Sequence, residues 1–385
     1  MRKACWVLIS VIAVAGLLMA GSGERVRPPS QVLDKSNESG DLAAKLERAL
    51  ADASKTAAGR AFWVGYAIDR LMAEGSHIGS FRSGRGERDL TIAEILAGKT
   101  VPGTAKDASR DIGRAAATAL ERIERRGKPE RKVVKELGFF LEYGPGKQPV
   151  LAEVRMSNLD LSFDFEGAPL IWLGKASADE SMRLTEALYG NAQEDEAREG
   201  LIAAAGCHGE ARLALPFLKK VLSGDDPDDL RKDAAFWIGQ QNDAGGLRLL
   251  AGTARKDRSE DVREGAVFGI SQIDLPEAVD ELIALAREEG RRDVRKQAVF
   301  WLGQMASKKA GGVLEEIAVD DTDLDIQEHA VFALSQLPDN EGVEALIRLA
   351  KTHRDPRVRK RAVFWLGESE DPRALEAIIG ILRDK

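Results

Sequence analysis

Two cysteines and four histidines are the residues of this 385-residue chain best suited to metal binding or nucleophilic chemistry. Cys207 and His208 are adjacent and could supply two metal ligands, but the sequence contains no second such pair. No nucleophile-elbow motif surrounds a serine. The glycines of residues 80–88, SFRSGRGER, lack the Lys-Ser/Thr that completes a phosphate-binding loop. We therefore expect a structural role for Cys207 and His208, no metal ion and no cofactor.

A second set of residues is suited to binding a polypeptide. Phenylalanine and glutamine recur together along the C-terminal half, where aromatic rings would supply apolar contact area and amides would supply hydrogen bonds. The candidate partner-binding residues are Phe236, Phe268, Phe300, Phe332, Phe364, Gln240, Gln272, Gln304 and Gln336. The same mixture suits the lateral contact between repeat units. Two interpretations are therefore open for the phenylalanines, inter-unit packing and a concave peptide-binding groove.

These residues are placed by a 32-residue period. Five aliphatic positions follow one another at that spacing: Leu230, Val262, Val294, Ile326 and Val358. A second helical pattern runs between them in the same register: Leu250, Leu282, Leu314, Leu346 and Ile378. Each unit is thus expected to be a pair of helices of about 11 residues, joined by turns rich in Asp, Gly and Pro.

The residue after each phenylalanine alternates in size, which doubles the period to 64 residues. The series reads Trp237, Gly269, Trp301, Ala333 and Trp365. Because protein interiors are close-packed, we expect each tryptophan to fill the space left by the Gly or Ala of a neighbouring unit.

Charged residues follow the same register. One position alternates in sign, Lys232, Glu264, Lys296, Glu328 and Lys360, and predicts a ladder of opposite charges that sets the stacking register. Another position repeats arginine: Arg231, Arg263, Arg295 and Arg359. We expect these arginines to bind turn carboxylates or helix-end carbonyls, with anion binding as the alternative.

The motif D-V-R-x-x-A-x-x-x-L-G, preceded by A-L-x-x-L, resembles the HEAT-like repeat of the phycobilisome-lyase type over residues 177–385. This resemblance implies an α-solenoid whose V-R helices line the concave side, capped by a terminal helix within 371–385. It leaves the function open, because such repeats occur in scaffolds, lyases and a few metalloenzymes. HEAT-like deoxyhypusine hydroxylase resembles this repeat class and holds two irons through His-Glu pairs. None of the four histidines here precedes a glutamate, so that motif is absent.

The region before the repeats is less regular. We expect a signal peptide over residues 1–20, because Arg2 and Lys3 precede a short apolar run, with an uncleaved membrane anchor as the alternative. A polar segment over residues 21–40 is predicted to be a disordered linker. An α+β module is expected over residues 41–176. The repeat solenoid follows over residues 177–385.

Within the N-terminal module, the sequence predicts helices over 41–75 and 106–126 and a loop over 75–89. Strands are expected over 149–163 and 168–174, in a hairpin or a three-stranded sheet. The segment 59–66, GRAFWVGY, echoes the repeat motif, so a diverged repeat there stays open. The basic stretch 121–135 is interpreted as a solvated helix face.

The composition favours a soluble protein without nucleic-acid partners. A net charge of −7 and a pI near 5.5 give the chain no general attraction to nucleic acid. We expect a non-enzymatic scaffold, exported to the periplasm or the medium, that binds a protein or peptide and does not insert stably into membrane after signal cleavage. The alternative is an enzyme or lyase-like accessory factor that acts through the N-terminal module. The sequence leaves the oligomeric state open.

Overall fold

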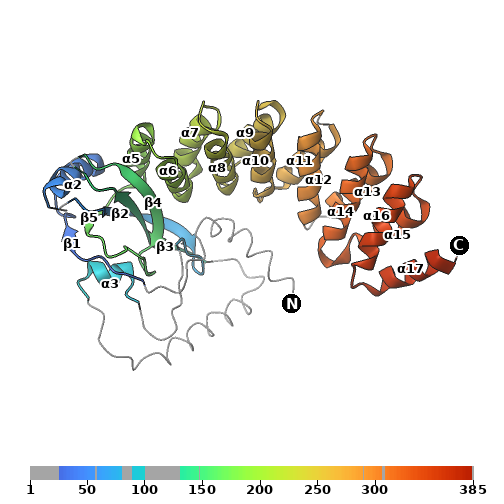
Figure 1. The fold of residues 1–385 in the computed structure, drawn as a ribbon, viewed down its shortest axis with the longest axis horizontal. Helices are drawn as coiled ribbons and strands as arrows, with labels where there is room; N and C mark the ends of the chain where they lie inside the picture. Colours follow the sequence, from blue (N-terminus) through green and yellow to red (C-terminus); the bar gives the residue numbers. More distant parts are fainter. Residues whose placement is uncertain are drawn as a thin grey trace, which may run out of the picture. The chain divides into compact units, whose positions relative to one another are not determined.

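The computed structural model describes residues 26–56, 59–79, 89–99, 131–146, 148–288, 290–305 and 308–383. The chain divides into two compact units between Ala214 and Leu215 (Figure 1). The predicted signal peptide, the predicted helix over 106–126 and most of the predicted loop over 75–89 lie outside the described residues.

A five-stranded mixed sheet forms the centre of the first unit, in the order β1–β5–β2–β3–β4. Strand β5 is parallel to both of its neighbours, β1 and β2, whereas β3 is antiparallel to both of its neighbours, β2 and β4. The strands are β1 (Val32–Asp34), β2 (Phe62–Ala73), β3 (Lys132–Tyr143), β4 (Leu151–Asn158) and β5 (Leu170–Lys175). The strands predicted over 149–163 and 168–174 are confirmed as β4 and β5. The sheet is larger than the predicted hairpin or three-stranded sheet.

Two segments that were predicted as helix contain strand instead. Helix α2 (Leu42–Thr56) ends early, and β2 occupies the rest of the predicted helix 41–75. Residues 62–68 are all buried, as in a strand covered on both faces, and periodicity does not distinguish such a run from a buried helix. The segment 59–66 leads into β2 and is not a diverged repeat. Residues 132–135, predicted as solvated helix, begin β3.

The prediction of a disordered linker over 21–40 is wrong for residues 26–40. Strand β1 lies within them and pairs with β5, and the backbone N–H of Lys35 donates to the carbonyl of Trp172 at 2.8 Å. The carbonyl of Arg27 likewise accepts from the N–H of Phe165 at 3.0 Å. Backbone pairing of this kind holds a short edge strand within a polar segment, which composition alone does not reveal.

Two helices pack on this sheet after β5, namely α5 (Ala178–Asn191) and α6 (Asp195–Cys207). Helix α6 approaches β4 closely, because a Cβ added at Gly200 would lie 2.6 Å from the carbonyl oxygen of Val154. A buried cluster that includes Trp63 and Phe140 receives the short helix α3 (Ile92–Leu96).

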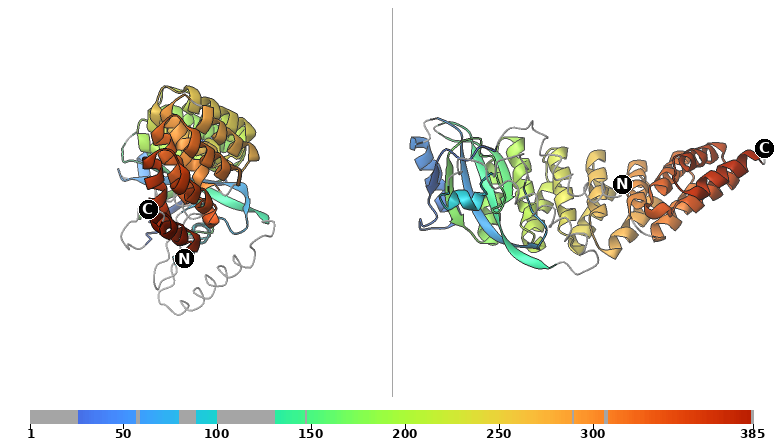
Figure 2. Two further views of the ribbon diagram at one scale, coloured as in Figure 1. Left: turned by 90° about the vertical axis from the view of Figure 1, so that its right-hand side faces the viewer. Right: turned by 90° about the horizontal axis from the view of Figure 1, so that it is seen from below.

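The second unit is a run of paired helices (Figure 2). One row consists of α8 (Asp228–Gln240), α10 (Glu260–Ser271), α12 (Arg292–Gln304), α14 (Leu324–Gln336) and α16 (Pro356–Gly367). The other row consists of α9 (Ala244–Lys256), α11 (Pro276–Glu288), α13 (Lys308–Asp320), α15 (Val343–Thr352) and α17 (Pro372–Arg383). Helix α7 (Ala211–Leu222) spans the boundary between the units, and a 3₁₀ turn, η1 (Pro338–Asn340), precedes α15. Successive helices of the first row contact one another, which confirms the predicted repeat of helix pairs.

Candidate protein-binding face

An unbroken chain of aromatic contacts runs along the row from α8 to α16. Successive ring centroids lie 4.8 to 6.3 Å apart, both within one helix and from one helix to the next. We call these eight rings the aromatic ladder. In order of contact they are Trp237, Phe236, Phe268, Trp301, Phe300, Phe332, Trp365 and Phe364. All five phenylalanines predicted from the sequence are therefore brought together.

The rings of the aromatic ladder are partly exposed. Seven of them are half-buried, and Phe364, at the end of the ladder, is 53% exposed. The phenylalanines thus do pack laterally between units, as one of the two interpretations expected. Their role in binding a partner stays a prediction.

Two kinds of contact alternate between neighbouring helices of the row, and they account for the 64-residue period. The contacts α8–α10 and α12–α14 are close. A Cβ added at Gly239 of α8 would overlap the carbonyl oxygen of Gly269 of α10, and a Cβ added at Gly303 of α12 would lie 2.6 Å from the carbonyl oxygen of Ala333 of α14. The contacts α10–α12 and α14–α16 are filled by indole rings, with Trp301 on Phe268 at 4.8 Å and Trp365 on Phe332 at 5.1 Å.

This arrangement corrects the predicted role of the small residues. We expected Gly269 to leave room for a tryptophan, but a Cβ there would lie 2.6 Å from the carbonyl oxygen of Ala235 on α8. Gly269 therefore admits a neighbouring backbone on one side of α10, while Trp301 stacks on Phe268 from α12. The tryptophans are also half-buried and not fully enclosed core residues.

The four candidate glutamines differ between the two kinds of unit. The side-chain amides of Gln272 and Gln336 each donate to the preceding serine hydroxyl at 3.0 Å. These hydroxyls, of Ser271 and Ser335, donate in turn to the carbonyls of Phe268 and Phe332 at 2.7 Å. The other two glutamines, Gln240 and Gln304, lie in the helices that carry tryptophan. They are preceded by glycine in place of serine, so the hydrogen bond to a serine hydroxyl has no counterpart there.

The repeated arginines stabilise the array, as predicted. Arg263 binds the carboxylate of Asp293 through Nε and Nη2 at 2.8 and 2.6 Å, and Nη1 donates to the carbonyl of Asp257 at 3.1 Å. Arg231 pairs with Asp257, and Arg295 pairs with Asp321. The guanidinium groups thus join turn carboxylates and helix-end carbonyls of successive units, which leaves anion binding without support.

The ion pairs among the described residues do not join the alternating lysines and glutamates to one another. Lys232 pairs with Asp229 of its own helix at 3.1 Å, and Glu328 pairs with Arg361 of α16 at 3.3 Å. Burial and then the charge of Glu260 raise the pKa of Glu264. Lys232 thus reaches a carboxylate of its own helix, and Glu328 pairs with an arginine and not with a lysine of the series.

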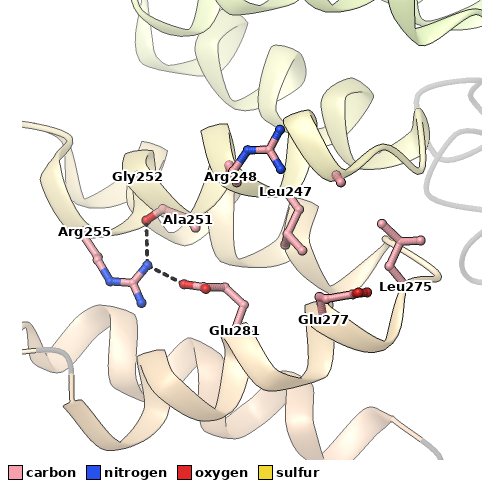
Figure 3. Close-up of a pocket in the computed structure, with 9 residues that line it drawn as sticks. Leu247, Arg248, Ala251, Gly252, Arg255, Leu275, Glu277 and Glu281 are labelled. Carbon is pink, nitrogen blue, oxygen red and sulfur yellow. Dashed lines mark hydrogen bonds and ion pairs between the residues drawn. The ribbon is translucent and has the colours of Figure 1, made fainter.

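A groove of about 560 Å³ lies in the other row, between α9 and α11 (Figure 3). Leu247 and Leu275 line it together with the charged side chains of Arg248 and Glu277. The guanidinium of Arg255 donates to the carbonyl of Ala251 and pairs with Glu281 across the groove. The pair of Arg255 and Glu281 thus links α9 to α11 and gives the groove a role in inter-unit contact.

The N-terminal module contains a buried polar cluster that sequence reasoning missed, because its members are far apart in the chain. The hydroxyl of Ser181 lies 2.9 Å from Tyr66 Oη and 2.9 Å from His208 Nε2. His208 Nδ1 lies 2.8 Å from the carbonyl oxygen of Ala204. All three polar side chains are buried. The cluster joins β2, α5 and α6, and it supports the structural role expected for His208.

The enzymatic alternative would draw on His77 and Arg82 as well as Tyr66, and His77 does not join this cluster. His77 is exposed and contacts Asp160 and Lys135, at 3.2 Å each. Arg82 lies outside the described residues. Burial raises the pKa of Tyr66 to about 12 and that of the Cys207 thiol to about 11, so neither group is ionised at neutral pH.

The buried His208 predicts that the first unit loses stability in mild acid. Burial lowers the pKa of His208 in the folded chain, so below about pH 6.5 the unfolded chain binds the additional proton. The contribution of the neutral His208 to the free energy of unfolding is therefore fully present above that pH. It is lost as the pH falls toward the folded pKa, by up to about 1.4 kcal/mol per pH unit. Urea unfolding at pH 7.5, 6.5 and 5.5 measures this slope. The variant His208→Gln should show a shallower slope, and equal slopes would contradict the assignment.

Two further features concern membrane and metal. Among the described residues, no helix combines the length and the apolar composition needed to cross a membrane. Within the same residues, no three side chains of His, Cys, Asp or Glu lie close enough together to hold a metal ion.

The array is similar to known repeat proteins. Residues 215–303 and 312–385 match the HEAT repeats family. No curated protein sequence matches the chain.

Three solved structures resemble parts of the chain. Human deoxyhypusine hydroxylase in complex with glycerol is 19% identical, with a TM-score of 0.30, over 52% of this chain and 77% of that one. The complex of CpcE and CpcF of phycocyanin lyase from Nostoc sp. PCC7120 is 20% identical, with a TM-score of 0.31, over 51% and 79%. Kap121p bound to Pho4p is 15% identical, with a TM-score of 0.31, over 49% and 25%. The residues that match the HEAT repeats family thus make up most of the second unit, which follows in the sequence a module built on a five-stranded mixed sheet.

Proposed function

We propose that this protein is a non-enzymatic scaffold that binds a protein or an extended peptide along the aromatic ladder. The observation that carries the proposal is the ladder itself, eight rings in continuous contact along five helices, each partly open to solvent. Aromatic side chains give the largest contact area for the least loss of side-chain entropy, and they dominate the energetics of protein interfaces.

Polar groups beside the ladder support a polypeptide as the partner. Gln272 and Gln336 are fixed by serine hydroxyls, and a fixed amide loses little entropy when it binds a peptide backbone. The indole N–H groups of Trp301 and Trp365 are buried without a hydrogen-bond acceptor among the described residues. Such a donor costs about 1–3 kcal/mol while it is unpaired. A carbonyl of a bound polypeptide, reached by a small shift of the ring, would satisfy it.

The variant Phe300→Ser tests the aromatic ladder as the binding face. We expect it to weaken partner binding at least about tenfold, because it removes a central ring of the ladder and the contact with Phe332. Binding of the partner recovered from the producing cell is measured by calorimetry on the purified chain. The matched control is Val319→Ser, an exposed apolar residue of α13 in the other row. Equal affinity of wild type and Phe300→Ser, with both folded by circular dichroism, would refute the ladder as the binding face.

The absence of catalysis is part of this proposal. The side chains closest to a catalytic arrangement, Tyr66, Ser181 and His208, are buried and bonded to one another, which favours a structural role. Export is also part of it and depends on residues 1–20 alone. Mass measurement of the chain from cell fractions tests export, and an intact Met1 in the cytoplasmic fraction would argue against it.

A further inference from the structure

The last helix of the array exposes an apolar stripe. On α17, Leu375 is 62% exposed, Ile379 39% and Leu382 68%. Their spacing of four and three residues places them on one face of the helix. The opposite face is buried through Ala374 and Ala377. Helix α17, which the sequence predicts as a cap, thus presents an apolar stripe, whereas a polar outer face is expected of a cap.

The equivalent face of the preceding unit is covered. Val343 and Ala350 of α15 stand 32 residues before Leu375 and Leu382, and both are buried. Helix α15 contacts α16 and α17, the helices of the following unit. The two leucines of the stripe on α17 thus correspond to positions that are buried inside the array.

Helix α16 shows the same feature at its glycine. Gly367 stands 64 residues after Gly303, yet a Cβ at Gly367 would meet no atom within 4 Å, whereas one at Gly303 would contact α14. Phe364 of α16 is exposed as well. We call Phe364, Gly367, Leu375, Ile379 and Leu382 the terminal face. It has the side chains of an internal helix contact but no helix upon it among the described residues.

We propose that the terminal face binds a second copy of this chain across a two-fold axis, with the two α17 helices antiparallel. The stripe is self-complementary in this arrangement. Leu375 and Leu382 are seven residues apart, about 10 Å along the helix. The axis places Leu375 against Leu382 of the second copy and brings the two Ile379 side chains together, as an isologous interface requires.

The charges beside the stripe select this occupant and this direction. Glu376 and Arg383 each follow a stripe leucine, are exposed, and are also seven residues apart, so they lie on the same side of α17. In the antiparallel pair, Glu376 of each copy faces Arg383 of the other. In a parallel two-fold pair these side chains would lie on opposite flanks of the interface, where Glu376 and Arg383 of the two copies could not pair. Charge complementarity with a second copy therefore accompanies the apolar match.

The first experiment measures the mass of the full chain over a range of concentrations by sedimentation equilibrium. We expect a reversible dimer. Ile379→Arg should weaken dimerisation on the order of a hundredfold, because it places two like charges at the axis. The control Leu71→Arg changes a residue of β2 that is 61% exposed, and it should leave the dimer intact. A wild-type chain that stays monomeric up to about 100 µM, a weak limit for a specific interface, would overturn the proposal.

The second experiment tests the geometry by charge reversal. Glu376→Arg and Arg383→Glu should each weaken the dimer, and the double variant should restore it, because the pairing is only inverted. Glu376 and Arg383 are both exposed, and circular dichroism of each variant confirms that it folds. Failure of the double variant to restore a dimer that both single variants weaken would overturn the antiparallel pairing. A dimer that is indifferent to both the charge reversals and Ile379→Arg would place its interface elsewhere.

Discussion

Replacing Arg263 with methionine is expected to lower the free energy of unfolding of the repeat array by about 3–5 kcal/mol. The guanidinium is nearly buried and binds the almost buried carboxylate of Asp293 through two nitrogens. It also satisfies the carbonyls of Asp257 and Arg258. Methionine keeps the length and the apolar stem of the side chain but leaves a desolvated carboxylate and two carbonyls without their donor. Urea unfolding followed by circular dichroism measures the loss.

The control for this variant lies in the neighbouring turn. Arg258 pairs with Asp225 at 3.4 Å, and both side chains are exposed. Because exposed pairs contribute about 0–1 kcal/mol, Arg258→Met should change the free energy of unfolding by less than about 1 kcal/mol. If the two variants were equally stable, the buried arginines could not be what joins successive units.

The second large effect is expected at the close contact between α12 and α14. Gly303→Val should destabilise the array by about 3 kcal/mol. The new Cβ would lie 2.6 Å from the carbonyl oxygen of Ala333 and 2.8 Å from the Cα of Ala333. The three nearest atoms all belong to Ala333, so there is no flexible side chain that could move aside. Thermal unfolding of the purified chain reports the change.

A second helical glycine separates this steric effect from helix propensity. A Cβ at Gly312 in α13 would meet nothing within 4 Å. Gly312→Val therefore exchanges one weak helix former for a slightly better one and should be neutral or stabilising by a few tenths of a kcal/mol. A similar loss in both variants would show that propensity, and not the close contact, sets the cost.

Repetition made the second unit predictable from the sequence. Each helix pair was indicated several times over, and Arg231, Arg263 and Arg295 revealed a shared structural role because they recur beside turn aspartates. The aromatic ladder was predicted in part: the five phenylalanines were singled out, but the tryptophans were assigned to the core. Spacing places a residue on a helix face, yet it does not show which neighbouring helix that face meets.

The first unit was less predictable for physical reasons. Strand β2 is buried along residues 62–68, so its sequence lacks the alternation that marks a half-exposed strand. The contact between Tyr66, Ser181 and His208 depends on the packing of α5 and α6 on the sheet, which no local pattern encodes. Strand β1 is held by backbone hydrogen bonds to β5, and its side chains do not indicate this pairing.

The alternation between close and indole-filled contacts also limits how such an array can change in length. Removal of one 32-residue unit would bring together two helices that carry tryptophan, or two that carry Gly269 and Ala333 at that position, and the contact between them would not match. Removal of 64 residues would join partners of the right kind. We therefore expect this packing to accept changes of length in steps of two units and not of one.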